Sequence, residues 1–266
     1  MPVLGLWVII FMDDKLPAVS YHSQIIELVN QYNDAEGLMM KLANFAGDKI
    51  EGLLKSIPDG FEAEIQKMIK TGLEKAYDTS EAINKNSLLP NVPNYFHKTA
   101  VTLSGAVGGL TGLPGAVAEL PITITTMFSS FQRISEQYDF DRSEPETKLE
   151  CLKVFSMGGP LNSDDDLDLS FVSARIGLNG QMVSNIISAA SKKLIVVITN
   201  KLGAQSVPIL GAITGATLNY AFINYYEEMA HIRFKLKQLQ LLHPNNDPLS
   251  DFIQALEKQN NKVYDG

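Results

Sequence analysis

The spacing of apolar residues near the C-terminal end of the chain constrains the fold more than any other feature of the sequence. Six large apolar residues follow one another there at alternating intervals of three and four residues. This spacing places the six side chains on one face of an α-helix. The residues are Phe222, Tyr225, Met229, Ile232, Leu236 and Leu239. We therefore predict a long helix that buries this face in a hydrophobic core.

Similar periodicity predicts helices along most of the chain. Residues 21–57 are expected to form two helices, because Gly37 weakens a helix in its middle. The Pro58-Asp59-Gly60 turn separates them from another helix. Further helical segments are expected at 122–137, 149–157 and 171–201, with a charged turn at 139–150 and a short helix at 249–256. The prediction is an all-α, multi-helix single domain at 21–245, with an N-terminal extension at 1–20 and a short helix and polar tail at 246–266.

Charge and cysteine content exclude some classes of function. The 266 residues carry a formal net charge of −8 and include no lysine- or arginine-rich stripe, so we expect no nucleic-acid partner. The single cysteine, Cys151, cannot form an intramolecular disulfide, which suits a reducing compartment. We expect a cytoplasmic protein, located either in solution or peripherally at the inner face of the membrane.

The first eleven residues are apolar, but they do not have the features of a signal peptide. No basic residue precedes them, and no small-residue cleavage site follows before Asp13-Asp14. We interpret residues 1–11 as a segment that docks on the domain. The alternative is that translation starts at Met12.

Two charge-free stretches, at 99–118 and 202–226, are interrupted by glycine and proline. Several of their glycines are four residues apart, a spacing that lets helix backbones approach closely in soluble cores and in membranes. We favour a buried, hairpin-like pair of stretches in the core, and a lipid-contacting hairpin is the alternative. The residues expected to contact a membrane or partner are Gly105, Gly108, Gly109, Gly112, Leu113, Pro114, Pro208, Gly211 and Gly215.

Glu119 is the most suggestive single residue, because it is the only charge between Thr99 and Gln132. It precedes a predicted helix whose partial positive charge would stabilise a carboxylate, so we expect it to cap that helix. The alternative is a catalytic or metal-binding carboxylate in a hydrolase site, with Arg133 as its ion partner if the chain folds back. The catalytic candidates are Glu119, Thr123, Thr126, Arg133 and Asn219.

Other polar residues have simpler interpretations. The chain has no P-loop, no Gly-x-Ser-x-Gly elbow, no His-Glu-x-x-His and no Cys-x-x-Cys, so we expect no cofactor and no metal. The acidic residues at 139–146 and 164–168 are interpreted as solvated loops. Cys151 is expected to be a buried core thiol. His231 is expected to form a surface ion pair with Glu227 or Glu228.

Several separate blocks of the sequence, in order, resemble the EcsC family. They are Lys49–Leu54, Leu113-Pro114-Gly115, Glu119–Thr126, Glu150-Cys151-Leu152 with Val154–Gly159, and Pro208–Ala212 through Asn219, Phe222 and Arg233. The family takes its name from a protein encoded beside an ABC transporter. The resemblance and the two charge-free stretches together lead us to expect an accessory module that binds lipid or a membrane protein at the cytoplasmic membrane face. The alternatives are a hydrolase around Glu119 and a soluble interaction scaffold.

Overall fold

The computed structural model describes residues 20–54, 61–85, 115, 117–157, 180–205 and 211–264. Every regular element within these ranges is an α-helix, which confirms the predicted all-α fold. The helices are α1 (Tyr21–Leu54), α2 (Phe61–Lys85), α4 (Leu120–Glu136), α5 (Pro145–Val154), α7 (Gly180–Gln205), α8 (Gly211–Leu242) and α9 (Pro248–Tyr264).

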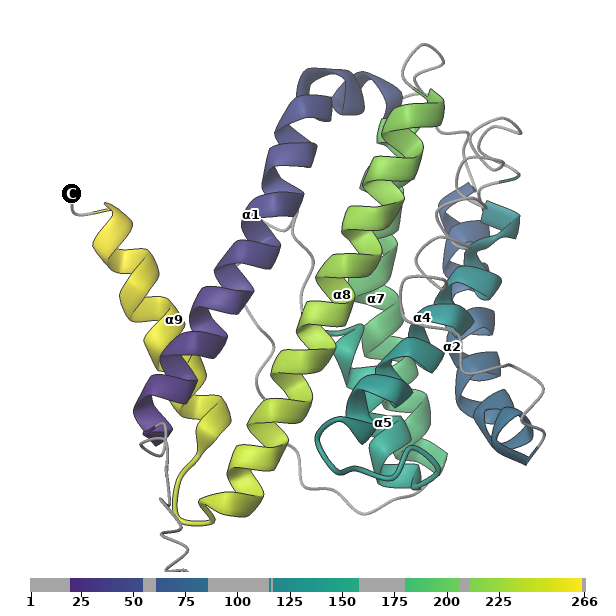
Figure 1. The fold of residues 1–266 in the computed structure, drawn as a ribbon. Helices are drawn as coiled ribbons and strands as arrows, with labels where there is room; N and C mark the ends of the chain where they lie inside the picture. Colours follow the sequence, from purple (N-terminus) through teal and green to yellow (C-terminus); the bar gives the residue numbers. More distant parts are fainter. Residues whose placement is uncertain are drawn as a thin grey trace, which may run out of the picture.

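The long helix α8 lies at the centre of the bundle (Figure 1). It contacts α1 on one side and α4 on the other, while α2 packs against α4 and α7. The short helix α5 lies among α4, α7 and α8, and α9 covers part of α1 near the C-terminal end of α8. Helices from distant parts of the sequence therefore share one core.

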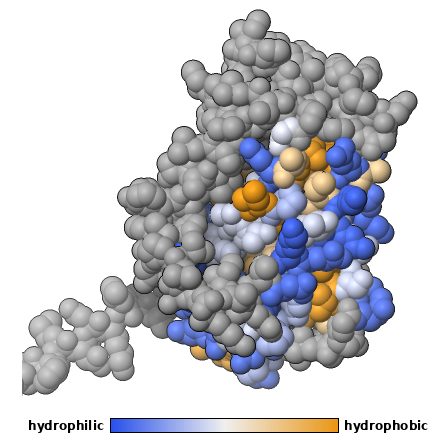
Figure 2. Space-filling view, turned by 90° about the vertical axis from the view of Figure 1, so that its right-hand side faces the viewer, coloured by the Kyte–Doolittle hydropathy of each residue, from blue (hydrophilic) through white to orange (hydrophobic). Residues whose placement is uncertain are grey.

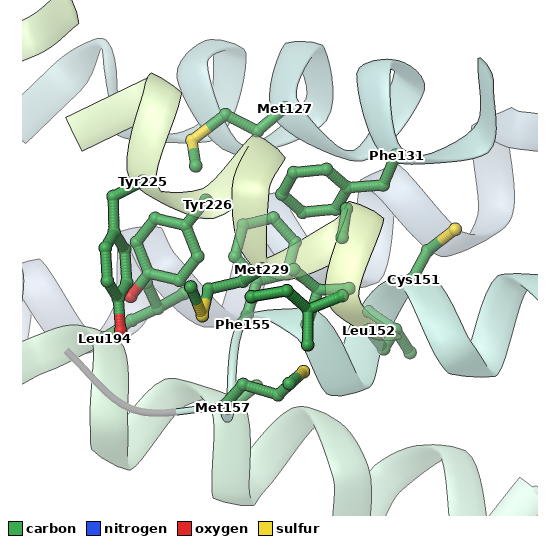
Figure 3. Close-up of a cluster of buried hydrophobic side chains, with 14 of the residues drawn as sticks. Met127, Phe131, Cys151, Leu152, Phe155, Met157, Leu194, Tyr225, Tyr226 and Met229 are labelled. Atoms are coloured by element: carbon green, nitrogen blue, oxygen red, sulfur yellow. The ribbon is translucent and has the colours of Figure 1, made fainter. Parts of the chain in front are cut away.

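The apolar face predicted for the last long helix is buried as expected. All six residues of that stripe on α8 are at most 4% exposed. Figure 3 shows Tyr226 and Met229 of α8 among Phe131 of α4, Leu152 of α5 and Phe155, which directly follows α5. The Phe131 and Phe155 ring centroids are 5.0 Å apart, within the range of favourable aromatic pairs.

Helix α5 differs from the sequence prediction, which placed a charged turn through residue 150. The helix begins at Pro145, whose fixed backbone angle suits the first helical turn and whose missing N–H costs nothing there. From Thr147 to Met157 every residue is buried, including Lys148, Glu150 and Lys153. In a sequence, a short helix with charged residues on all sides is typical of a surface segment. Here these charged side chains lie inside the bundle.

Two helices are longer than the sequence predicted. Helix α1 runs through Gly37 without a break, because one glycine costs a helix only about 1 kcal/mol and packing on α8 and α9 offsets that cost. Helix α9 extends to Tyr264 and packs its Phe252 ring against Tyr32 of α1, with ring centroids 6.1 Å apart.

Helices α2 and α4 approach each other closely at Gly72. A Cβ atom added to Gly72 would lie 3.0 Å from the Cα atom of Pro121 and 3.0 Å from Cδ1 of Ile124. This contact places the first turn of α4 against the middle of α2. The close helix approach that small residues permit is therefore found at Gly72, a glycine outside the two charge-free stretches.

No helix in the described ranges combines the length and apolar content needed to cross a membrane. On the face shown in Figure 2, described hydrophilic residues are interspersed with separate hydrophobic ones. The five large hydrophobic side chains exposed in the described residues are Ile26, Ile122, Tyr220, Leu241 and Leu242. They belong to different parts of α1, α4 and α8.

Candidate functional site

Four of the five catalytic candidates lie in or next to one helix, α4. Glu119 immediately precedes it, Thr123 and Thr126 follow in its first half, and Arg133 lies in its last turn. At 3.6 residues per turn, all four point within about a quarter of the helix circumference. The fifth candidate, Asn219, belongs to α8, and its side chain lies outside the described residues.

These residues share a face but do not converge on one point. Glu119 and Arg133 are fourteen residues apart along a continuous helix, which separates their backbones by about 20 Å. The predicted ion pair between them is therefore wrong, because the chain does not fold back within α4. Glu119 occupies the N-cap position of α4, where its charge was expected, and its side chain makes no capping hydrogen bond there.

The threonine hydroxyls of α4 are used within the helix itself. Thr126 Oγ1 donates a hydrogen bond to the Ile122 carbonyl over 2.8 Å, and Thr125 Oγ1 donates to the Pro121 carbonyl over 2.7 Å. Such bonds satisfy a hydroxyl with the preceding turn. They give Thr126 a structural role in this conformation.

Of the nine residues expected at a membrane or partner surface, two lie within the described parts of the chain. Gly105, Gly108, Gly109, Gly112, Leu113, Pro114 and Pro208 lie outside the described residues. Gly211 and Gly215 lie in the first two turns of α8, which is helical through both of them. The proposed hairpin between the two stretches therefore stays a prediction.

The most concentrated charge in the described core surrounds Glu150 of α5. Arg233 of α8 donates to Glu150 Oε2 through Nε over 2.6 Å, and its Nη2 lies 2.5 Å from the same oxygen. Lys153 Nζ lies 3.2 Å from Glu150 Oε1, and Lys237 Nζ lies 3.7 Å from it. We call these four residues, Glu150, Lys153, Arg233 and Lys237, the Glu150 centre.

Helix geometry explains why these residues meet. Arg233 and Lys237 are one turn apart on α8 and face α5, where Glu150 and Lys153 are also one turn apart. The side chains of Glu150, Lys153 and Arg233 are 6–9% exposed, and that of Lys237 is 20% exposed. Lys237 Nζ also lies 2.7 Å from the exposed Glu146 carboxylate. The centre therefore reaches from the core to the surface through Lys237.

The Glu150 centre is set up to keep its carboxylate ionised. Burial raises the pKa of Glu150, but the positive charges of Arg233, Lys153 and Lys237 outweigh burial and lower that pKa to about 2. Burial also lowers the pKa of Lys153, and the nearby Glu150 carboxylate opposes that change. A carboxylate with so low a pKa is a poor general base at neutral pH. The arrangement is suited to tying α5 to α8.

A second polar layer joins α4, α8 and α1. Ser130 Oγ donates to Glu227 Oε1 over 2.7 Å inside the core. Tyr138 Oη and His231 Nδ1 are 3.0 Å apart. His231 therefore contacts Tyr138, and its surface pair with Glu227 or Glu228 stays a prediction. Glu228 instead accepts a hydrogen bond from Gln31 Nε2 over 2.6 Å.

Cys151 and Tyr226 are buried polar groups of a different kind. Cys151 is fully buried, as predicted, and burial together with the negative charge of Glu150 raises the pKa of its thiol well above the usual value. Tyr226 is also fully buried, and within the described structure its hydroxyl has no hydrogen-bond partner. For both groups burial is the largest effect and raises the pKa, which is the opposite of what activates a nucleophile.

No group of three or more histidine, cysteine, aspartate or glutamate side chains in the described part of the chain is arranged to hold a metal ion. The Glu150 centre holds one carboxylate among three cations, which is the opposite of a cation site.

Sequence reasoning did not identify this centre as a site. The signal was the position of Glu150 and Arg233 in two of the blocks that resemble one family.

Comparison with known proteins agrees with those blocks. Searches of curated proteins and of solved structures gave no match. The model of the EcsC protein family matches residues 23–239. This range contains α2, α4, α5 and α7 and nearly all of α1 and α8, and it includes both halves of the Glu150 centre. The chain therefore belongs to the EcsC protein family.

Proposed function

We propose that this chain is a binding module that works at the cytoplasmic face of a membrane, where it holds lipid or a membrane protein. The observation that supports this most directly is the direction of α4 and α8. Ser130 of α4 contacts Glu227 of α8, and Tyr138, eight residues later, contacts His231, four residues later. The two helices therefore run in the same direction, and their N-termini point toward the same end of the bundle (Figure 1).

The N-termini of α4 and α8 are where the two charge-free stretches enter the described structure. The stretch at 99–118 leads directly into α4, and α8 begins inside the stretch at 202–226. The described residues in which the two stretches join α4 and α8 thus lie toward the same end of the bundle. An apolar, glycine-rich end of a helical bundle is a suitable surface for lipid or for the helices of a membrane protein.

One exposed apolar side chain follows the first stretch, and another lies within the second. Ile122 in the first turn of α4 is 68% exposed, and Tyr220 of α8 is 46% exposed. They precede Ser130 and Glu227 by eight and seven residues, so each lies about 10–12 Å from that contact toward the helix N-termini. Ile122 and Tyr220 are the described residues that we expect to enter a membrane surface.

A hydrolase receives less support from the described residues. Glu119 and Arg133 are separated along α4, Thr126 is bonded within its helix, and Glu150 is held ionised. A general acid or base that works near neutral pH needs a pKa close to that pH. A binding role uses the fold without requiring such a group.

Liposome flotation with purified protein tests the proposal. The comparison is between wild type, an Ile122→Gln and Tyr220→Gln double variant, and a control Leu241→Gln and Leu242→Gln double variant at the opposite end of α8. We expect wild type and control to float with vesicles, and the first variant to bind about tenfold more weakly, which corresponds to about 1.4 kcal/mol. Comparing neutral with anionic vesicles distinguishes binding through apolar contacts from binding through electrostatic attraction to lipid. Absence of flotation with every composition would remove the lipid proposal.

A further inference from the structure

The C-terminal end of α8 exposes two consecutive leucines that the proposed membrane surface does not explain. Leu241 is 68% exposed and Leu242 is 64% exposed. They end a 32-residue helix, so they lie about 30 Å along α8 from Tyr220. Two adjacent large apolar side chains at a helix end are a candidate docking surface. We call it the Leu241–Leu242 surface.

The described chain begins beside this surface. The Tyr21 ring packs edge-on against His243, the residue that directly follows Leu242, with ring centroids 5.0 Å apart. Tyr21 Oη donates to Asp251 Oδ2 over 2.6 Å, which fixes the start of α1 against α9. At the same end, the Ser20 hydroxyl accepts a hydrogen bond from the Ser23 backbone N–H over 3.1 Å. Residues before Ser20 therefore extend from a fixed point next to the two leucines.

The N-terminal segment has the composition and the reach to cover this surface. Nine of the eleven residues at 1–11 are apolar, and one of them is Trp7, the only tryptophan in the chain. Residues 12–20 connect this segment to α1, and nine residues can span up to about 30 Å when extended. The reach needed is short, because the Tyr21 ring contacts the ring of His243, the residue that follows Leu242.

We propose that residues 1–11 dock in the same molecule on the Leu241–Leu242 surface. The contact removes from water two leucines and an apolar segment that would otherwise both be exposed. It is an intramolecular contact, so the short connection gives it a high effective concentration. This inference is independent of the membrane proposal, because it concerns the opposite end of α8 and needs no lipid.

Trp7 allows a direct test, because tryptophan fluorescence of the full chain comes from this segment alone. In the absence of lipid we expect a blue-shifted emission maximum and slow quenching by acrylamide. The Leu241→Gln and Leu242→Gln double variant should red-shift the emission and raise the quenching constant at least twofold. The matched control is Ile122→Gln, which changes an equally exposed apolar residue at the other end and should leave Trp7 unchanged. Circular dichroism confirms that each variant is folded.

Three results would overturn the proposal. The first is that Trp7 of the wild type is quenched as fast as free tryptophan. The second is that Trp7 is protected from quenching but does not respond to the leucine substitutions. The third is protection that rises with protein concentration, which would show that a second copy supplies the contact. A Val8→Cys and Leu242→Cys pair, oxidised at low protein concentration, gives a second readout, and we expect an intramolecular disulfide. Failure of that pair to cross-link above the level of Val8→Cys with Ile122→Cys would also count against docking.

Discussion

Replacing Glu150 with glutamine should destabilise the protein strongly at neutral pH and progressively less in acid. Glutamine keeps the size of the side chain but removes the charge that balances Arg233, Lys153 and Lys237. The pKa of Glu150 is about 2, against a usual value of 4.5. At about 1.4 kcal/mol per unit, the ionised carboxylate contributes about 3 kcal/mol to the free energy of unfolding at pH 7.

The pH dependence follows from the direction of this change. A carboxylate whose pKa is lower in the folded state stabilises fully above its unfolded pKa, and that contribution is lost as the pH falls toward the folded value. The difference between wild type and Glu150→Gln should therefore stay near 3 kcal/mol from pH 7 to about pH 5.5. By pH 3.5 it should fall to about 2 kcal/mol.

Urea unfolding at a series of pH values measures this difference. The matched control is Glu146→Gln, which removes a carboxylate that contacts the same Lys237 but whose side chain is 67% exposed. Exposed ion pairs contribute at most about 1 kcal/mol, so this variant should unfold nearly like wild type. The reasoning is refuted if both variants lose the same stability at pH 7, or if the cost of Glu150→Gln does not shrink in acid.

Three further substitutions and one labelling experiment test the packing. Gly72→Val should lower the free energy of unfolding by about 1–3 kcal/mol, since its Cβ would press on the Pro121 backbone. Gly37→Ala should raise it by up to about 1 kcal/mol, because nothing lies within 4 Å of the added atom in that helix. Tyr226→Phe removes an unpaired buried hydroxyl, so unfolding in urea should show stability unchanged or about 1 kcal/mol higher. Cys151 should react with a thiol reagent only after urea unfolds the chain, and rapid labelling of the native protein would contradict its burial.

The sequence was sufficient for elements whose apolar periodicity is strong. The stripe on α8 is buried as predicted, and Ile65, Ile69 and Leu73 of α2, which follow one another at helical spacing, are also buried. Pro121 lies in the first turn of α4, where its fixed backbone angle suits a helix. These features depend on local spacing and on proline geometry, which a single sequence contains.

The sequence was insufficient to predict features that depend on tertiary packing. Gly37 was interpreted as a helix break, but packing of α1 on its neighbours keeps the helix continuous. The charges of α5 resembled a surface turn, because the partners that allow their burial, Arg233 and Lys237, lie more than eighty residues away. Among the candidate site residues, Glu119 and Arg133 were expected to meet, and a continuous α4 keeps them apart.

Hydrogen–deuterium exchange with and without vesicles tests the central claim most directly, because it reports which end of the bundle meets the membrane. The account predicts slower exchange in peptides covering the first turns of α4, around Ile122, and the first half of α8, through Tyr220. Peptides of α9 should not change. Unchanged exchange at the starts of α4 and α8, or protection confined to α9, would contradict the account.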